Sequence, residues 1–204
     1  MSRSRLPKND ASPSGRDGQV REPRKVRAAQ NVSRMCLVCG VENVAGFRAR
    51  FFELDSGELV GVFQPREEHQ GYPGRLHGGL ASAILDETIG RAINVADTHT
   101  WGVTAEFTIR FRKPVPLDRE IRAIGRITRD GSRVFEGTGE IVLEDGTLAV
   151  EARGTYVKLP IEGIVDTDFV QSQWFADTLP LPAEIELGEA PSPSAGAARR
   201  EGAS

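Results

Sequence analysis

The chain has 204 residues, 39% of them hydrophobic, and a formal net charge of -3 at pH 7. This size predicts one globular domain with extensions, and the apolar content is sufficient for a buried core. No apolar run approaches the ~20 residues that span a bilayer, and the N-terminus lacks the apolar region of a secretory signal. The two cysteines, Cys36 and Cys39, exclude a disulfide-rich scaffold and favour a reducing cytoplasm, with no membrane partner expected.

The N-terminal segment differs from the rest of the chain in charge. Residues 1–34 contain nine Lys or Arg and three acidic residues, a balance typical of contact with nucleic acid or another acidic surface. The segment has no aromatic residue to stack on bases, and its Ser, Pro, Gly and Arg content is typical of a solvated leader. We therefore expect a disordered basic leader over 1–34, a folded domain over 35–180, a disordered tail over 181–204, and no nucleic-acid partner.

The folded part is predicted, in chain order, as two strands, one helix and four further strands. Alternating apolar residues and turn signals place the strands at 47–54, 58–63, 103–111, 120–128, 133–143 and 147–159. Apolar residues at helical spacing predict a helix of about five turns over 80–96. A short helix or strap over 168–176 is expected to pack back through Trp174 and Phe175. This order predicts an α+β fold in which an antiparallel sheet of five to six strands wraps around one central helix.

A glycine-rich turn opens the predicted helix and brings reactive groups into it. Gly78 and Gly79 leave backbone N–H groups unshielded at the helix start, where they can polarise a carbonyl oxygen. Asp86 lies among apolar residues of the same helix, where burial raises the pKa of a carboxyl group towards that of a useful general base. Glu87 points about 100° away from Asp86 on a helix, so only one of the two acids can face the same site. Asp86 follows Gly79 by two turns and is the favoured acid.

The motif His77-Gly78-Gly79, with Asp86 nine positions after the histidine, resembles the hotdog-fold acyl-CoA thioesterases, especially the PaaI-like and 4-hydroxybenzoyl-CoA thioesterase-like types. The segment 36–46, which begins Cys36-x-x-Cys39, is similar to the opening of a bacterial branch of that group. The resemblance covers roughly residues 35–160. It implies a dimeric hotdog enzyme, assembling further as a dimer of dimers, that hydrolyses an acyl-CoA substrate without a cofactor.

The resemblance also implies roles for individual residues. The Gly78 N–H would polarise the thioester carbonyl, Asp86 would act as general base or nucleophile, and Thr104 would help to hold the water. His77 would orient the turn, and in relatives the glycine and the acid that face one substrate come from different subunits. The residues assigned to substrate and CoA binding are Gln70, Gly79, Arg110, Arg112, Lys113, Ser132 and Arg133.

Other interpretations stay open at this stage. Cys36-x-x-Cys39 is compatible with zinc or redox chemistry, but structural zinc needs four ligands and redox motifs of this spacing normally sit in a βαβ context. We therefore expect buried thiols near a subunit interface and no metal. A non-catalytic acyl-CoA binder on the same fold is one alternative function. An enoyl-CoA hydratase or dehydratase is another, because His69-x-x-x-Pro73-Gly74 faintly resembles the motif of those enzymes.

Overall fold

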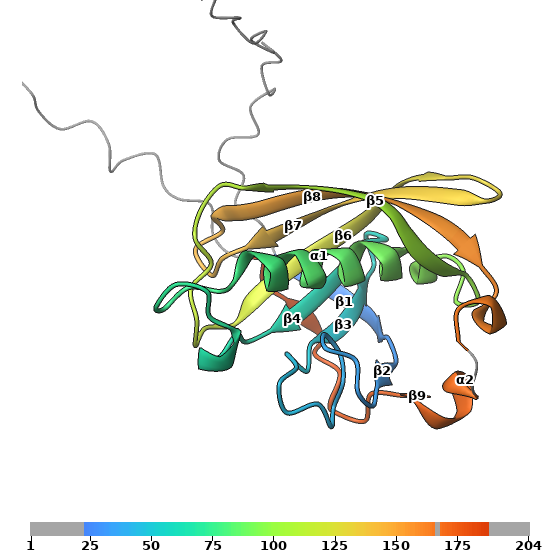
Figure 1. Cartoon of the computed structure of the whole chain (residues 1–204), viewed down its shortest axis with the longest axis horizontal. Coiled ribbons are helices and arrows are strands. Elements are labelled where there is room, and N and C mark those ends of the chain that lie inside the picture. Colours follow the sequence, from blue (N-terminus) through green and yellow to red (C-terminus); the bar gives the residue numbers. More distant parts are fainter. Residues whose placement is uncertain (1–22, 166–167, 188–204) are drawn as a thin grey trace, which may run out of the picture.

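The computed structural model describes residues 23–165 and 168–187, and it shows one large sheet curled around a long helix (Figure 1). The strands are β1 (Arg24–Ala29), β2 (Val32–Ser33), β3 (Arg50–Leu54), β4 (Leu59–Phe63), β5 (Trp101–Phe111), β6 (Ile121–Asp130), β7 (Val134–Val142), β8 (Leu148–Leu159), β9 (Trp174–Phe175) and β10 (Glu184–Ile185). The helices are α1 (Gly78–Ala92) and α2 (Phe169–Ser172), with 3-10 turns η1 (Glu67–His69), η2 (Ile93–Val95) and η3 (Ile161–Gly163).

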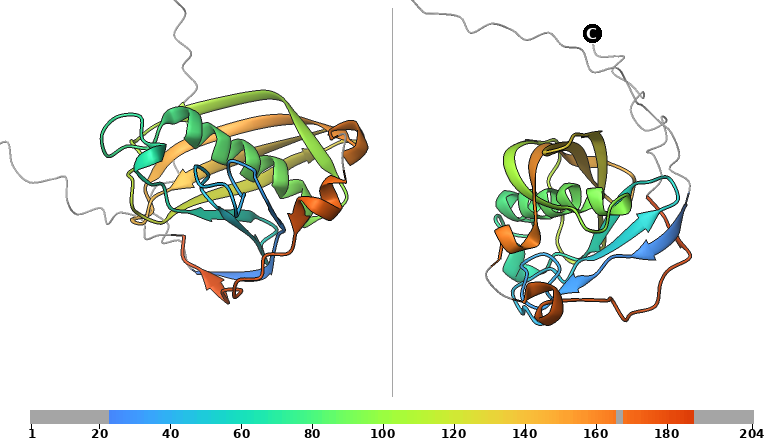
Figure 2. Two further views of the ribbon diagram at one scale, coloured as in Figure 1. Left: turned by 60° about the horizontal axis from the view of Figure 1, so that its bottom comes forward. Right: turned by 90° about the vertical axis from the view of Figure 1, so that its right-hand side faces the viewer.

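The sheet has the strand order β10-β1-β3-β4-β6-β7-β8-β5, and every neighbouring pair is antiparallel. Helix α1 runs across its concave face, while α2 and β9 lie near one end of that helix (Figure 2). The small pair β2–β9 joins this C-terminal strap to the N-terminal part of the chain. The expected α+β arrangement around one central helix is therefore confirmed, and β5 forms one edge of the sheet.

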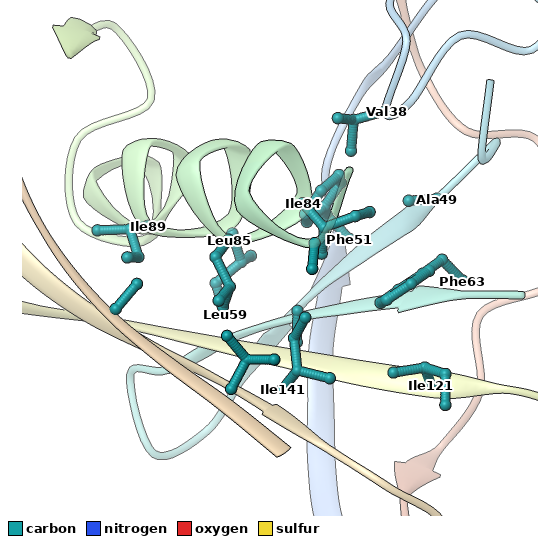
Figure 3. Close-up of a cluster of buried hydrophobic side chains, with 14 of the residues drawn as sticks. Val38, Ala49, Phe51, Leu59, Phe63, Ile84, Leu85, Ile89, Ile121 and Ile141 are labelled. Carbon is teal, nitrogen blue, oxygen red and sulfur yellow. The ribbon is translucent and has the colours of Figure 1, made fainter. Parts of the chain in front are cut away.

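Helix α1 is apolar around much of its circumference because most of its surface is covered. Ile84, Leu85 and Ile89 are fully buried and lie over Leu59 and Ile141 of the sheet (Figure 3). Fully burying an aliphatic side chain contributes about 1.5–3 kcal/mol, so this face anchors the helix firmly on the sheet. The position of α1 matters for function, because the predicted catalytic groups are carried on it.

Glycines in the sheet allow α1 to approach closely. A Cβ atom on Gly137 would lie 2.6 Å from a methyl carbon of Ile89, and one on Gly139 would lie 2.8 Å from the same side chain. A Cβ on Gly125 would lie 2.6 Å from the carbonyl oxygen of Thr88. Three glycines on two neighbouring strands thus form the flat surface on which the second half of α1 rests.

The sheet has eight strands rather than the expected five to six because both ends of the domain extend it. The six predicted strands are present as β3 to β8, and the additional strands are β1 and β10. The boundaries at 34 and 181 were therefore wrong for the residues that the structure describes. The parts of the predicted leader and tail at 1–22 and 188–204 lie outside the described residues.

A second apolar cluster explains these additional strands. Phe52, Val60 and Ile124 point away from α1 and need cover, which Ile185 and Leu187 supply. The sequence analysis judged the first 34 residues by their net charge and so overlooked the short strand β1. In β1, half-buried positions alternate with exposed basic ones.

The helix and the C-terminal strap differ in detail from the sequence predictions. Helix α1 begins two residues earlier than expected, and its last predicted turn is the 3-10 segment η2. The strap is confirmed as α2 and β9, and Trp174 packs against Trp101 and Phe169, whereas Phe175 remains 37% exposed. None of the helices among the described residues is long and apolar enough to cross a bilayer.

Candidate active site

Asp86 lies on α1 with its side chain directed at the neighbouring sheet. Its Oδ1 atom accepts a hydrogen bond of 2.8 Å from the Thr104 hydroxyl and one of 3.1 Å from the Tyr156 hydroxyl. Tyr156 also donates to the backbone oxygen of Asp86, at 3.1 Å. Both hydroxyls reach the same carboxylate oxygen, and no bond of the other oxygen, Oδ2, to the described residues is found. The carboxylate is therefore fixed through one oxygen while the second can hold a water molecule.

Burial has the largest effect on this carboxyl group and raises its pKa above the ordinary value. The hydrogen bonds from Thr104 and Tyr156 oppose that shift, and the nearby charge of Glu87 adds to it. Burial also raises the pKa of Tyr156, so the phenol stays protonated and remains a donor. A carboxylate whose pKa is raised is a stronger base for removing a proton from water than an ordinary surface aspartate.

The start of α1 presents one free backbone donor. His77 caps the helix, and its Nδ1 atom accepts the N–H of Gly79 at 3.0 Å. No bond of the Gly78 N–H to any described residue is found, so the first amide of the helix remains available. A Cβ atom on Gly78 would lie 3.3 Å from the Phe111 ring, which places this amide beside the far end of β5. His77 thus fixes the turn, and the Gly78 N–H, unlike that of Gly79, has no partner among the described residues.

Gly78 and Asp86 are too far apart to act on one carbonyl within a single chain. They are eight residues apart on α1, and a rise of 1.5 Å per residue separates them by about 12 Å along the helix axis. A reacting carbonyl must lie within about 3 Å of both the oxyanion donor and the attacking water. Within one chain, Gly78 and Asp86 therefore do not form a complete site.

A cavity of about 240 Å³ lies beside Asp86 and is lined by Thr104, Tyr156 and Gly90 among others. One end of it is closed by the aromatic side chains of Trp101, Phe169 and Trp174, whose ring centroids are 5.4–5.8 Å apart. A larger hollow of about 760 Å³ beside η3 and α2 contacts neither Asp86 nor Gly78. The cavity at Asp86, unlike this hollow, lies where it can hold a group that reacts with the carboxylate.

The residues predicted to bind CoA fall into two groups at opposite ends of β5. Arg110, Arg112 and Lys113 lie at the Phe111 end, near Gly78, and the first two pair with Glu151 at 3.8 Å and 2.7 Å. Ser132 and Arg133 form the turn at the other end, where the Arg133 carbonyl accepts the N–H of Lys158 at 2.9 Å. About six strand residues, roughly 20 Å, separate Thr104 from Arg110.

The remaining binding candidates lie around the glycine turn. Gln70 is exposed and its side-chain oxygen accepts the N–H of Gly74 at 3.3 Å, so it stabilises the turn beside His77. Among the residues that the structure describes, Lys113 and Arg133 form no ion pair, which leaves both cations available for phosphate. Within one chain, Gln70 therefore lies at the glycine turn with Gly78 and Gly79, whereas Arg133 lies in the β6–β7 turn.

His69 is not available for the chemistry of a hydratase. Its side chain is 1% exposed, its Nδ1 accepts the Arg66 N–H at 3.0 Å, and its Nε2 lies 3.0 Å from the Ala45 oxygen. Its ring also packs on Phe47, with centroids 4.2 Å apart. Both ring nitrogens are engaged in holding a loop, so the hydratase interpretation loses its catalytic histidine.

The sequence analysis missed two partner residues of this site, Tyr156 and Arg91. Tyr156 is opposite Thr104 in the pairing of β5 with β8, so only the strand register brings it to Asp86. Glu87, directly after Asp86, pairs with Arg91 at 2.7 Å in the same chain, and the Arg91 guanidinium lies over the Trp174 ring at 4.4 Å. An acid four positions before an arginine on a helix is the sequence signal for that second pair.

Arg91 connects this helix to the cysteine loop. Its Nη2 donates to the Cys39 sulfur at 2.9 Å, and its Nη1 donates to the Asn31 oxygen at 2.8 Å. A hydrogen bond from the Cys39 thiol lowers the pKa of Cys36 to about 7, against the effect of burial. Both cysteines line the cavity at Asp86, so they belong to the same region of the molecule.

Comparison with known proteins agrees with this geometry. Residues 73–150 match the family model described as thioesterase superfamily. Acyl-coenzyme A thioesterase THEM4 of Bos taurus is 29% identical over 148 residues, which cover 72% of this chain and 58% of the relative. THEM4 of Mus musculus is 27% identical over 148 residues, which cover 72% and 61%. The chain thus spans about three fifths of the length of these curated relatives.

Solved structures give the same fold. The crystal structure of protein RHA08564, a thioesterase superfamily protein, has a TM-score of 0.57 and 28% identity, and the match covers 61% of this chain and 63% of that one. The Escherichia coli PaaI protein from the phenylacetic acid degradation operon has a TM-score of 0.51 and 18% identity over 55% of this chain and 80% of that one, which supports the fold alone. A sheet wrapped around one helix, a glycine turn at the helix start and the match over residues 73–150 lead to one conclusion: the chain has the hotdog fold and resembles the thioesterase superfamily.

Proposed function

We propose that this protein hydrolyses an acyl-CoA thioester to the free acid and CoA, in a site built from two copies of the chain. The observation that carries the proposal is the Asp86 carboxylate, half-buried and held through Oδ1 by Thr104 and Tyr156. This arrangement leaves Oδ2 without a bond to the described residues and available to a water molecule. A protein that only bound acyl-CoA would have no need for a carboxylate prepared in this way.

In the proposed reaction, Asp86 removes a proton from water and the resulting hydroxide attacks the thioester carbon. The C–S bond then breaks, the proton held by Asp86 passes to the departing CoA thiolate, and the free acid is released. A positioned general base typically contributes 10²–10⁴-fold to such a rate. The Gly78 N–H stabilises the negative charge that develops on the carbonyl oxygen, an effect of about 2.7–4 kcal/mol for one donor.

The proposed site needs a second copy because Gly78 and Asp86 of one chain are about 12 Å apart along α1. Strand β5 supports such an assembly, since its eleven residues form an edge of the sheet with one side unpaired. A long exposed edge is a ready template for pairing with another chain. Two-fold symmetry would place Gly78 of each chain opposite Asp86 of the other and give two equal sites. We propose a homodimer of this kind, with pairing of dimers as a further expectation.

Binding of CoA would then use cations from both chains. Lys113 follows the Phe111 end of β5, near the glycine turn, and Arg133 lies in the β6–β7 turn towards the other end of that strand, so a dimer would bring these two ends together. We also propose the cytoplasm as the location, because Cys36 and Cys39 are free thiols, as is typical of a reducing compartment.

The test is release of free thiol from short, medium, long and aromatic acyl-CoA substrates by wild type and by Asp86→Asn. The matched control is Asp55→Asn, an exposed aspartate in the β3–β4 turn that is remote from the cavity. We expect turnover by wild type and the control, and a loss of at least 100-fold in Asp86→Asn. Equal turnover by Asp86→Asn would show that the proposed base is wrong. Retention of CoA esters without any turnover would instead favour the non-catalytic binder.

A further inference from the structure

The loop that contains Cys36 and Cys39, before β3, has a conformation suited to binding a metal ion. The Cys36 sulfur accepts backbone N–H bonds from Val38 at 3.3 Å and Cys39 at 3.5 Å. The Gly40 N–H donates to the Cys36 oxygen at 2.9 Å, and a Cβ on Gly40 would lie only 2.3 Å from that oxygen. The turn is closed tightly and requires glycine at its end. It holds the two sulfurs on the same side, with backbone donors that favour negative charge on the first one.

The fold brings a third ligand group to this turn. One ligand atom each from Cys36, Cys39 and Glu87 lies within 4.8 Å of the other two. Glu87 comes from α1, far along the chain, so an argument from sequence that counted only cysteines and histidines could not include it. All three residues also line the cavity of about 240 Å³ beside Asp86. Any fourth ligand can therefore be a water molecule from that cavity.

We propose that Cys36, Cys39 and Glu87 bind one zinc ion, with the fourth position open to the cavity. Two thiolates and one carboxylate suit a borderline-soft divalent cation, and three protein ligands with one open position is an established zinc arrangement. Binding replaces the two thiol protons by Zn²⁺, so two protons are released for each ion bound.

Arg91 forms hydrogen bonds with two of the proposed ligands and leaves each of them able to bind the metal. Its Nε holds Glu87 at Oε1, 2.7 Å away, and its Nη2 holds the Cys39 sulfur, so the other carboxylate oxygen stays available. Two thiolates, one carboxylate and one guanidinium sum to a charge of -2, which Zn²⁺ neutralises. Hydrogen bonds of this kind to metal ligands orient them and raise metal affinity. The ion would fasten the cysteine loop to α1 one residue from Asp86.

The experiment uses the full chain, reduced and freed of metal with a chelator, and titrates it with Co²⁺ under nitrogen. We expect one Co²⁺ per chain, with thiolate-to-cobalt charge-transfer absorption and the visible bands of a four-coordinate ion, all removed by one equivalent of Zn²⁺. Cys36→Ser and Cys39→Ser should lose the charge-transfer absorption. Glu87→Gln should bind Co²⁺ at least about tenfold more weakly, because even substitution of residues that only hydrogen-bond to metal ligands lowers metal affinity 10- to 100-fold.

Asp86→Asn is the matched control, because Asp86 is the neighbouring acid on α1 and its carboxylate is bound to Thr104 and Tyr156 instead. It should retain one Co²⁺ per chain with unchanged absorption, even though it is expected to lose hydrolysis. Failure of the metal site and failure of the proposed reaction are thus separated. Reduced wild type with two titratable thiols and no charge-transfer band would overturn the proposal. So would an absorption spectrum that survives in Cys39→Ser.

Discussion

Replacing Gly78 by proline removes the proposed oxyanion donor and little else. Gly78 is the first residue of α1, and its N–H forms no bond with the described residues, so the fold loses no hydrogen bond. Proline is favoured at this first helical position because its fixed φ suits a helix start. The preceding His77 has φ -63° and ψ 133°, the extended conformation that a residue before proline prefers.

The size of the effect follows from the chemistry of the lost donor. Removing one oxyanion donor costs about 2.7–4 kcal/mol of transition-state stabilisation, which lowers kcat by roughly 100- to 1,000-fold. The oxyanion exists only in the transition state, so kcat should fall while KM changes little. Alanine at the same position is the matched control, because it adds a Cβ that meets the Phe111 ring at 3.3 Å and keeps the N–H.

The assay is thiol release from the best acyl-CoA substrate, with urea unfolding of both variants as a check on the fold. We expect Gly78→Pro to lose at least 100-fold in kcat and Gly78→Ala to lose less than about tenfold, a difference that corresponds to more than 1.36 kcal/mol. Equal losses in the two variants would attribute the effect to the Phe111 contact and refute the oxyanion argument. Full activity of Gly78→Pro would refute it as well.

Four further predictions concern the site and the fold. Thr104→Val should lower kcat by about 10- to 100-fold, because a hydrogen bond to a charged group is worth about 1.5–3 kcal/mol, and Thr104→Ser should restore most of the activity. Tyr156→Phe should lower kcat and cost no more than about 3 kcal/mol in urea, because only the hydroxyl bonds to Asp86 are lost while the stacking of this ring on Phe135, with centroids 4.9 Å apart, is kept. Gly137→Ala should destabilise the fold by about 1–3 kcal/mol through its contact with Ile89, whereas Gly163→Ala, with no atom nearer than 3.7 Å, should be close to neutral in the same urea titration. Ile185→Ala should cost about 2 kcal/mol or more and Glu186→Ala almost nothing; equal unfolding midpoints would show that β10 does not cover the sheet.

The main elements could be predicted because their signals are local. Turns such as Asp55-Ser56-Gly57 and the strong alternation of the long strands place β3 to β8 without any knowledge of the fold. The apolar surface of α1 predicts a central helix in the same way. Strand β1 was missed because it lies in a segment dominated by basic residues. Its role depends on Ile185, whose contact with the sheet no local pattern reveals.

The part of the candidate site that lies on α1 and the turn before it could be predicted from the sequence. Gly78, His77 and Asp86 share a continuous segment, so their spacing was informative. Tyr156 was not predictable, because its contact with Asp86 depends on the pairing of β5 with β8. The cluster of Glu87 with the two cysteines depends on how the loop packs on α1, which spacing along the chain does not encode.

The most direct test of the composite site is to mix two inactive variants, Gly78→Pro and Asp86→Asn, and measure thiol release. Each mixed dimer would have one site with both defects and one site with neither. After exchange of subunits in an equal mixture, half of the dimers are mixed, so activity should recover to about a quarter of wild type. Mixed dimers that form but remain inactive would contradict a site in which Gly78 of one chain acts with Asp86 of its partner.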